Sequence, residues 1–441
     1  MKKLFMTALL CGATSFMFAQ TNVSVVSSTG NSNDVDVVQM GLSNDSDVLQ
    51  TGQIGGLGGD DNIADVMQNG DRNKSVIKSK GDRNSAELDQ IGDDNSSRQI
   101  QGAGWAEDNS AKATQIGDRN KSVQRQFYDN NNAVVEQTGD DNDARQVQNS
   151  TNAGAGNDAF AEQYGDLNKS RQRQEGNSNG ADVYQGDVSN DAFQRQDGDS
   201  NYALTYQNDV FLGYTGGFNY SEQRQTGDGN DATVDQGLGN ASNNDAYQTQ
   251  IGDNNSAYAT QIGDANMSRE MQVGDGNDSS VSQDGNDNTS GVGATTSPPA
   301  TYGDYGQYGD DNDAATSQTG DRNDSKIYQE GNMNDADVMQ DGNDNQALVF
   351  SKGNSNMADL DSTGDWNTSL VRQFGNSNST TASQVGNLNI SSAIQVGTSN
   401  TVLSAQIGNS NFSLTTQTGA GHSNTVGQFG NNNNSNVTQH D

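Results

Sequence analysis

The chain has 441 residues, a formal net charge of −35 and only 29% hydrophobic residues, a composition that on its own predicts disorder. The acidic balance argues against nucleic acid or an anionic membrane surface as a partner, because both require a basic surface on the protein. No stretch after the N-terminus is apolar enough to span a bilayer.

Residues 1–20 have the features of a secretory signal peptide. Two lysines form a charged start, an apolar run extends from Leu4 to Phe18, and Ala19 lies at the expected cleavage position. Cys11, the only cysteine, lies within this segment, and a lipoprotein signal is the alternative, although the preceding Leu10 is bulky for one. We therefore expect a secreted mature chain without cysteine or disulfides.

From Ser28 to Gln439 the chain repeats with a period of eleven residues. In the regular units Gly lies two residues after the Gln and Asn five residues after it, while Ser79, Ser351 and Ser362 take the Gln position in three units. The Gln positions of the most regular units are Gln250, Gln261, Gln272, Gln307, Gln318, Gln329, Gln340, Gln373, Gln384, Gln395 and Gln406; their Asn positions include Asn323, Asn334, Asn378, Asn389, Asn400 and Asn411; and their glycines include Gly309, Gly320, Gly331, Gly375, Gly386, Gly397 and Gly408. A fixed short period is typical of a repeat architecture, and we give it more weight than the composition.

Each unit is expected to form one turn and one strand. Gly reaches positive φ freely, and the Asp or Asn that follows it favours turns. The remaining residues alternate, so that Asn334, Ala336, Val338 and Gln340 would face one way and Met339 the other. Two units then close one flattened coil, and successive coils stack at about 4.8 Å as an all-β solenoid with two parallel sheets.

Stacked coils would place identical inward amides one above another. A buried amide needs partners for both its C=O and its NH₂ group. At strand spacing, Gln and Asn side chains can bond to their copies in the coils above and below and so form amide ladders. We expect such ladders to hold together a narrow core that contains few apolar residues.

The repeat divides into an acidic N-terminal block at 21–288, an irregular joint at 289–306 that holds both prolines, and a more regular C-terminal block at 307–441. About 35 units would form about 17 coils, a rod about 80 Å long. Five insertions fall between a Gln and its Asn and so lengthen turns: Gly52–Asp61, Gly102–Asp108, Asn149–Gly156, Asn208–Phe218 and Gly237–Asn243. The first three are four units apart, which predicts loops on one edge of the rod.

The two blocks differ in the residue that follows the turn glycine. Up to Asn367 this residue is mostly Asp, and from Gln373 it is Asn or another neutral residue. Stacked aspartates repel by roughly 0.9 kcal/mol per neighbouring pair before salt screening, comparable to one net hydrogen bond. We expect the acidic block to assemble less readily than the neutral one, with local relief from arginines that lie beside the aspartates, namely Arg72, Arg83, Arg119 and Arg322.

The string Q-x-G-x-x-N-x-[AS]-x-x-x-Q, as in Gln250 to Gln261 and Gln329 to Gln340, resembles the curlin repeat of bacterial curli subunits. The resemblance covers nearly all of the mature chain. It implies a functional amyloid, whose secreted subunits leave through a dedicated outer-membrane pore, are templated by a minor nucleator subunit and form cross-β fibres for biofilm matrix and surface adhesion. The chain departs from that family in its length, its charge and its loops, which leaves bulk subunit, nucleator and tip adhesin open.

No catalytic or metal site is expected. His422 and His440 lack the positioned partners that a general base needs. The stretch Gly55–Asp60 matches the start of a calcium-binding nonapeptide, but only once, and paired aspartates such as Asp93 and Asp94 favour loose counterion binding. Scattered aromatic residues are either loop anchors or contacts for a sugar or a surface: Trp105, Tyr128, Tyr214, Phe218 and Trp366.

The sequence therefore predicts a secreted, extracellular structural subunit of curli-like functional amyloid fibres. Copies would join end to end, because the end of a solenoid exposes unpaired strand edges that template another chain. No cofactor and no specific small molecule are expected. The alternatives are a monomeric secreted β-solenoid adhesin, a fibre nucleator or minor subunit, and a calcium-stiffened or ice-binding solenoid; an enzyme is the least favoured class.

Overall fold

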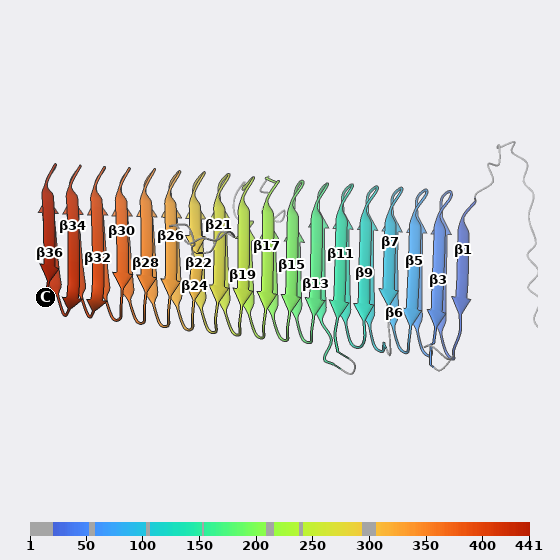
Figure 1. Cartoon of the computed structure of the whole chain (residues 1–441). Helices are drawn as coiled ribbons and strands as arrows, with labels where there is room; N and C mark the ends of the chain where they lie inside the picture. Colours follow the sequence, from blue (N-terminus) through green and yellow to red (C-terminus); the bar gives the residue numbers. More distant parts are fainter. Residues whose placement is uncertain are drawn as a thin grey trace, which may run out of the picture.

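The computed structural model describes residues 21–52, 58–102, 106–151, 154–208, 216–237, 241–292 and 306–441. The expected signal peptide at 1–20 and both prolines lie outside these ranges. All regular structure within them is β-strand, arranged as a straight rod with β1 at one end and β36 at the other (Figure 1). In the described ranges no helix is long and apolar enough to cross a membrane.

The strands form two parallel sheets, here called sheet A and sheet B. Sheet A has 19 strands: β1 (Val23–Ser28), β3 (Asp45–Thr51), β5 (Lys74–Lys80), β7 (Ser96–Gln101), β9 (Lys121–Phe127), β11 (Asp143–Asn149), β13 (Lys169–Glu175), β15 (Asp191–Asp197), β17 (Tyr220–Thr226), β19 (Asp245–Ile251), β21 (Met267–Val273), β23 (Thr289–Val292), β24 (Gly306–Tyr308), β26 (Asp324–Glu330), β28 (Gln346–Lys352), β30 (Thr368–Phe374), β32 (Ile390–Thr398), β34 (Phe412–Ala420) and β36 (Asn434–His440).

Sheet B contains the strands that alternate with these along the chain. They are β2 (Asp34–Met40), β4 (Ile63–Asn69), β6 (Ser85–Ile91), β8 (Ser110–Ile116), β10 (Asn132–Thr138), β12 (Asp158–Tyr164), β14 (Gly180–Gln185), β16 (Tyr202–Gln207), β18 (Asp231–Gln236), β20 (Ser256–Ile262), β22 (Asp278–Asp284), β25 (Asp313–Thr319), β27 (Asp335–Asp341), β29 (Met357–Thr363), β31 (Ser379–Val385), β33 (Thr401–Ile407) and β35 (Ser423–Phe429).

Strand pairing confirms the expected coil of two units. Each strand pairs in parallel with the equivalent strand of the next coil, so that Gln373 of β30 aligns with Gln395 of β32, and Gln384 of β31 aligns with Gln406 of β33. The described chain completes about 18 such turns, here called rungs. The all-β solenoid with two parallel sheets is therefore confirmed.

The side chains that the alternation places inward are buried, and those that it places outward are partly or fully exposed. In β27 and the residue before it, Asn334, Ala336, Val338 and Gln340 are at most 1% exposed, whereas the outward Met339 is 49% exposed. The apolar interior residues form separate clusters toward the two ends of the rod, with a small third cluster between them. Amide side chains fill the space that these clusters leave.

The sheet in which the preceding strand lies determines the edge of the rod at which each insertion begins. Those that follow β3, β7 and β11 all begin at the C-terminal ends of sheet A strands, which lie along one edge of the rod (Figure 1). Those that follow β16 and β18 begin at the ends of sheet B strands and hence at the opposite edge. The first three insertions therefore start on the same edge, as the four-unit spacing predicted.

The pairing runs through the expected joint at 289–306. The fragments β23 and β24 together occupy one rung, because both pair with β21 on one side and with β26 on the other. This interruption thus falls inside a strand, unlike the five shorter ones, which lengthen turns. The boundary between the two blocks is one of composition, and the rungs on its two sides are in register.

Candidate polymerisation site: the amide ladders and the ends of the stack

The repeated glutamines form two continuous columns inside the rod, one in each sheet. Where the next rung also carries a glutamine, the Nε2 atom donates to the Oε1 atom of that glutamine, as from Gln384 to Gln406 at 3.0 Å and from Gln373 to Gln395 at 3.1 Å. Sheet A holds Gln250, Gln272, Gln307, Gln329, Gln373 and Gln395 of the predicted set, and sheet B holds Gln261, Gln318, Gln340, Gln384 and Gln406.

The second N–H of each amide joins the two sheets. Gln384 Nε2 donates to the backbone carbonyl of Thr368 at 3.0 Å, and Gln406 Nε2 donates to that of Ile390 at 2.9 Å. Both acceptors begin strands of sheet A. The amide thus satisfies its two donors and its acceptor inside the core, which is what burial of a Gln side chain requires.

Serine replaces glutamine in the columns at Ser79, Ser351 and Ser362. Ser79 Oγ donates to Gln101 Oε1 at 2.9 Å. Ser351 Oγ donates to Gln373 Oε1 at 2.9 Å, and Ser362 Oγ donates to Gln384 Oε1 at 3.1 Å. The shorter side chain keeps the bond to the following rung. The donor groups of Gln329 and Gln340 are bonded across the core, to the backbone carbonyls of Asp313 and Asp324.

The asparagines form a second kind of ladder, with the donors pointing the opposite way. The backbone N–H of Asn345 donates to Oδ1 of Asn323 on the preceding rung at 3.1 Å, and Asn345 Nδ2 donates to the carbonyl of Gly364 at 2.8 Å. The same bond from the backbone N–H ends on Asn334, Asn378, Asn389, Asn400 and Asn411. Asparagine therefore ties each turn to its neighbours on both sides.

The predicted turn glycines all have positive φ, between 103° and 125°: Gly309, Gly320, Gly331, Gly375, Gly386, Gly397 and Gly408. A Cβ atom on Gly386 would collide with the carbonyl oxygen of Gly408 on the next rung, and the other six meet the equivalent oxygen. These positions need Gly for two reasons, the backbone conformation and the close stacking of turns.

The Asp or Asn that follows the turn glycine forms a third ladder, along the edge of the rod. The repulsion between stacked aspartates expected from the sequence does not include the bonds of this ladder. The backbone N–H of Asp71 donates to Oδ1 of Asp93 on the next rung, and that of Asp93 donates to Oδ1 of Asp118, both at 2.8 Å. Asn387 and Asn409 make the same bond in the neutral block, also at 2.8 Å. Asp and Asn share this role because both offer a side-chain oxygen, and the N–H groups offset part of the charge on the aspartates.

Each turn arginine forms its ion pair with an aspartate on the next rung, and not with the aspartate that precedes it in the sequence. Arg72 makes a two-point ion pair with Asp94, and Arg119 makes one with Asp141, each 22 residues further along the chain. The bound guanidinium lowers the pKa of both carboxyls. Arg322 pairs in the same way with Asp344, and Arg83 with Asp108. Because these pairs are exposed to solvent and screened by salt, each adds little to the stability of the rod.

A third glutamine column was missed by the sequence reasoning, which treated its position as variable. In sheet A it runs from β7 to β19, through Gln99, Gln124, Gln146, Gln172, Gln194, Gln223 and Gln248. Its signal in the sequence is a glutamine two residues before the ladder glutamine. The facing column of sheet B has Ala, Val or Thr at the same level, from Ala113 to Ala259, and so leaves room for the longer amides.

This inner column ends on a carboxyl group. Gln248 Nε2 donates to Glu270 Oε1 at 3.3 Å, and the Oε2 atom of Glu270 has no hydrogen-bond partner among the described residues. Glu270 is 1% exposed. Burial raises its pKa to about 8, because the charged form would lose its hydration.

The ends of the described stack have one-sided pairing. Strands β35 and β36 pair only with β33 and β34, and β1 and β2 pair only with β3 and β4. At the first end, the inward Val26 of β1 is 49% exposed, whereas its counterpart Val48 on the next rung is fully buried. These edges are where a further strand could be added.

The other residues singled out in the sequence do not assemble a site. His422 takes an asparagine position, and its backbone N–H donates to Asn400 Oδ1. Tyr128, Phe218 and Trp366 are exposed turn residues with φ of 59–64°, while Trp105, Tyr214 and the first half of Gly55–Asp60 lie outside the described residues. Within the described ranges, no group of three or more His, Cys, Asp or Glu side chains is placed to hold a metal ion.

The fold and its ladders define the class as a β-solenoid of eleven-residue amide repeats. A family model described as curlin associated repeat matches the chain at residues 59–92, 309–342 and 331–364. The chain therefore contains curlin associated repeats at these positions, which supports the resemblance, and its repeats and fold fit a curli-like structural subunit. No curated protein matches the chain.

Proposed function

We propose that this protein is a secreted structural subunit of curli-like functional amyloid fibres and that it polymerises by adding rungs end to end. The observation that carries the proposal is the continuity of the ladders up to the terminal strands. Gln428 and Gln439 each use one amide N–H to reach a backbone carbonyl, of Phe412 and Ser423, and the other N–H has no acceptor among the described residues. A second chain would supply that acceptor.

The ladders give such growth a direction. Glutamine side chains donate toward the C-terminal end of the stack, as from Gln395 to Gln417, whereas the backbone N–H at the asparagine position donates toward the N-terminal end. Joining the C-terminal end of one copy to the N-terminal end of another continues every donor–acceptor pair. Parallel strand edges extend across the same junction, as in cross-β assemblies.

The curlin associated repeats suggest an extracellular or surface-associated protein. Biofilm matrix and surface adhesion are the roles that we propose for the fibre on this ground. An outer-membrane export pore and a nucleator subunit are the partners that the family implies. Whether the chain is the bulk subunit or itself a nucleator depends on how readily it starts fibres alone.

The test is fibre formation by the purified chain lacking residues 1–20. We expect thioflavin-positive fibres, seen as unbranched filaments by electron microscopy, and acceleration by sonicated seeds of the same fibres. A chain that remains a soluble monomer over days would overturn the proposal.

A monomeric adhesin is the second candidate, and one observation favours it. The interior bonds of the rod are already formed within a single chain, so a folded monomer is self-sufficient except at its two ends. A soluble, folded monomer that binds a surface and resists seeding would support this function.

A further inference from the structure

The two broad faces of the rod carry opposite charges. On the outer face of sheet A, the seven strands from β5 to β17 present 12 Lys or Arg and 5 Asp or Glu side chains. On the outer face of sheet B, the seven strands from β6 to β18 present one Lys and 8 Asp or Glu. The excess is seven charges on each face, with opposite sign. We call these the basic face and the acidic face.

The basic face stands out against the rest of the chain. The whole protein has 23 Lys and Arg residues, so more than half of them lie on seven strands of one sheet. Several form no ion pair with any described residue, among them Arg98, Arg145 and Lys169. Such a concentration of unpaired cations in an acidic protein is a surface that attracts carboxylates.

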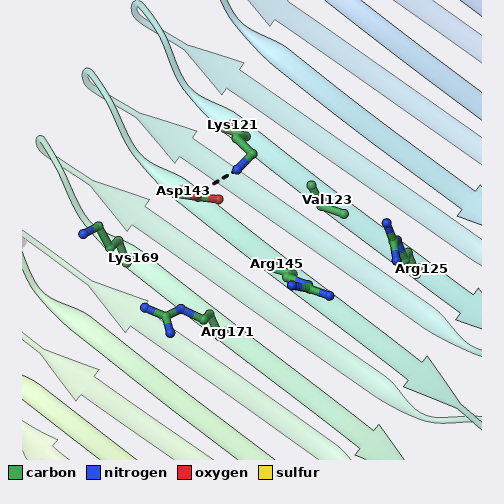
Figure 2. A pocket seen from close by; sticks show the side chains of 7 residues that line it. All are labelled: Lys121, Val123, Arg125, Asp143, Arg145, Lys169 and Arg171. Atoms are coloured by element: carbon green, nitrogen blue, oxygen red, sulfur yellow. Dashed lines mark hydrogen bonds and ion pairs between the residues drawn. The ribbon is translucent and has the colours of Figure 1, made fainter.

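The face is also hollowed at its centre. Side chains of β9, β11 and β13 line a hollow of about 490 Å³, and Figure 2 shows how these side chains lie. Its lining residues are Lys121, Val123, Arg125, Asp143, Arg145, Lys169 and Arg171. Five of these seven are cationic, and the single carboxylate, Asp143, is already paired with Lys121 at 3.2 Å. The hollow can therefore accept acidic side chains from outside.

We propose that the basic face binds the acidic face of a second copy of this chain, so that rods associate side by side. Both faces are built on parallel strands about 4.8 Å apart, so cations and carboxylates repeat with the same spacing along the rod. The carboxylates of the second copy are held on rigid strands, which lowers the entropy lost on binding in comparison with a flexible polyanion.

The size of the contact is sufficient for a stable interface. Seven strands at about 4.8 Å, each with seven residues at about 3.3 Å, give a face of roughly 750 Å². Two such faces would bury roughly 1,500 Å² in total, within the range of specific protein interfaces. Because the contact joins two different faces, each added copy leaves one basic and one acidic face free, and association continues as an open layer of rods.

This contact is independent of end-to-end growth, since it uses the sides of the rod. The test uses two charge-reversal variants of the chain lacking residues 1–20. One reverses the basic face by Arg98→Glu, Arg145→Glu and Lys169→Glu, and the other reverses the acidic face by Asp89→Lys, Glu136→Lys and Glu162→Lys. Lateral association is measured by sedimentation velocity at low salt, and the number of rods side by side is counted in electron micrographs.

Each variant alone should lose at least about tenfold in lateral affinity, because like charges then face each other. An equimolar mixture of the two should recover it, since the reversed faces match again. A control that makes the same change in net charge on sheet A beyond the basic face, Lys326→Glu with Lys352→Glu and Arg372→Glu, should associate like the wild type. Wild-type association should also weaken in about 1 M salt, where the screening length falls to about 3 Å.

Single rods of the wild type at low salt, or a mixture that does not recover, would overturn the proposal. Binding of heparin to the basic face without self-association would instead assign that face to a polyanion. Failure to elongate appears in the micrographs as short rods, whereas failure of the lateral contact appears as long single rods. The two proposals are therefore separated by the same images.

Discussion

Glu270 stands where the inner glutamine column would continue, and it makes the stability of the rod depend on pH. Its carboxyl is fully buried and keeps its proton up to about pH 8, whereas in the unfolded chain it ionises near its ordinary value of 4.5. Between these values the folded state binds more protons than the unfolded state. The stability that the protonated Glu270 carboxyl gives to the folded state is therefore fully present below about pH 4.5, and it is lost as the pH rises toward 8.

The substitution Glu270→Gln should remove this loss, because Gln is neutral and accepts the same bond from Gln248. At pH 7 we expect the variant to be more stable than the wild type by up to about 3 kcal/mol. The measurement is the midpoint of urea unfolding at pH 5 and at pH 8, with the outward Glu136→Gln as control. An equal difference between Glu270→Gln and wild type at both pH values would contradict this account.

A second feature at this scale is the bulky turn residue with left-handed backbone. Leu388 has φ of 59° and is 55% exposed, so its side chain gains little from packing while its backbone is strained. Leu388→Asn should raise the free energy of unfolding by about 0.5–1 kcal/mol, because Asn adopts this conformation more readily. Thermal unfolding measures the effect, and Leu403→Asn, on the exposed face of β33, serves as the control that should not stabilise.

At the scale of elements, one strand contributes a single rung to one glutamine column, and neighbouring strands contribute to different columns. Gln384 and Gln406 are consecutive rungs of sheet B, while Gln395 lies between them in the chain but in sheet A. Removing all three would break both columns near the C-terminal end. It would leave the carbonyls of Thr368, Ser379 and Ile390 without their amide donors.

The triple variant Gln384→Ala, Gln395→Ala and Gln406→Ala should slow fibre growth, since each lost bond costs about 1 kcal/mol before the cost of the cavities. Seeded thioflavin kinetics measure the growth rate, and circular dichroism before seeding shows whether the monomer still folds. Alanine at the outward neighbours Thr381, Ile394 and Leu403 is the matched control. Growth at the wild-type rate in the triple variant would argue against a role of the ladders in assembly.

For the whole molecule, the ends of the rod should control its length. Gln439→Lys places a charge on the inward side of β36, where it is partly exposed in a single chain but would be buried between two stacked chains. Burying an unpaired ammonium is costly, so we expect at least about a tenfold slower elongation with little change in monomer stability. The outward Thr438→Lys adds the same charge as a control, and filament length in electron micrographs is the readout. Equal inhibition by both variants would point to general repulsion instead.

Much of this architecture could be predicted from the sequence, because the residues that determine the turn, the strand and the inward face all lie within one eleven-residue unit. The eleven-residue step, Gly331 with the turn residues after it, and the alternation from Asn334 to Gln340 predict strand, turn and inward face without reference to any other unit. The inner column from Gln99 to Gln248 is equally visible in the sequence, but along the whole chain its position varies among apolar residues such as Val and Ile and polar residues, and it therefore counts as variable in the eleven-residue pattern.

Features that depend on which sheet a unit enters required the tertiary structure. Alternate units go to opposite faces, so cations from Lys74 to Arg224 and carboxylates from Glu87 to Asp235 are interleaved in the sequence yet separate in space. The pairing of Arg72 with Asp94 also required the tertiary structure, because the two residues meet only when successive coils stack. So did the finding that β23 and β24 together form one rung. The period and the inward residues are local properties of the chain, whereas the charge of each face is a sum over strands that only the coiling brings together.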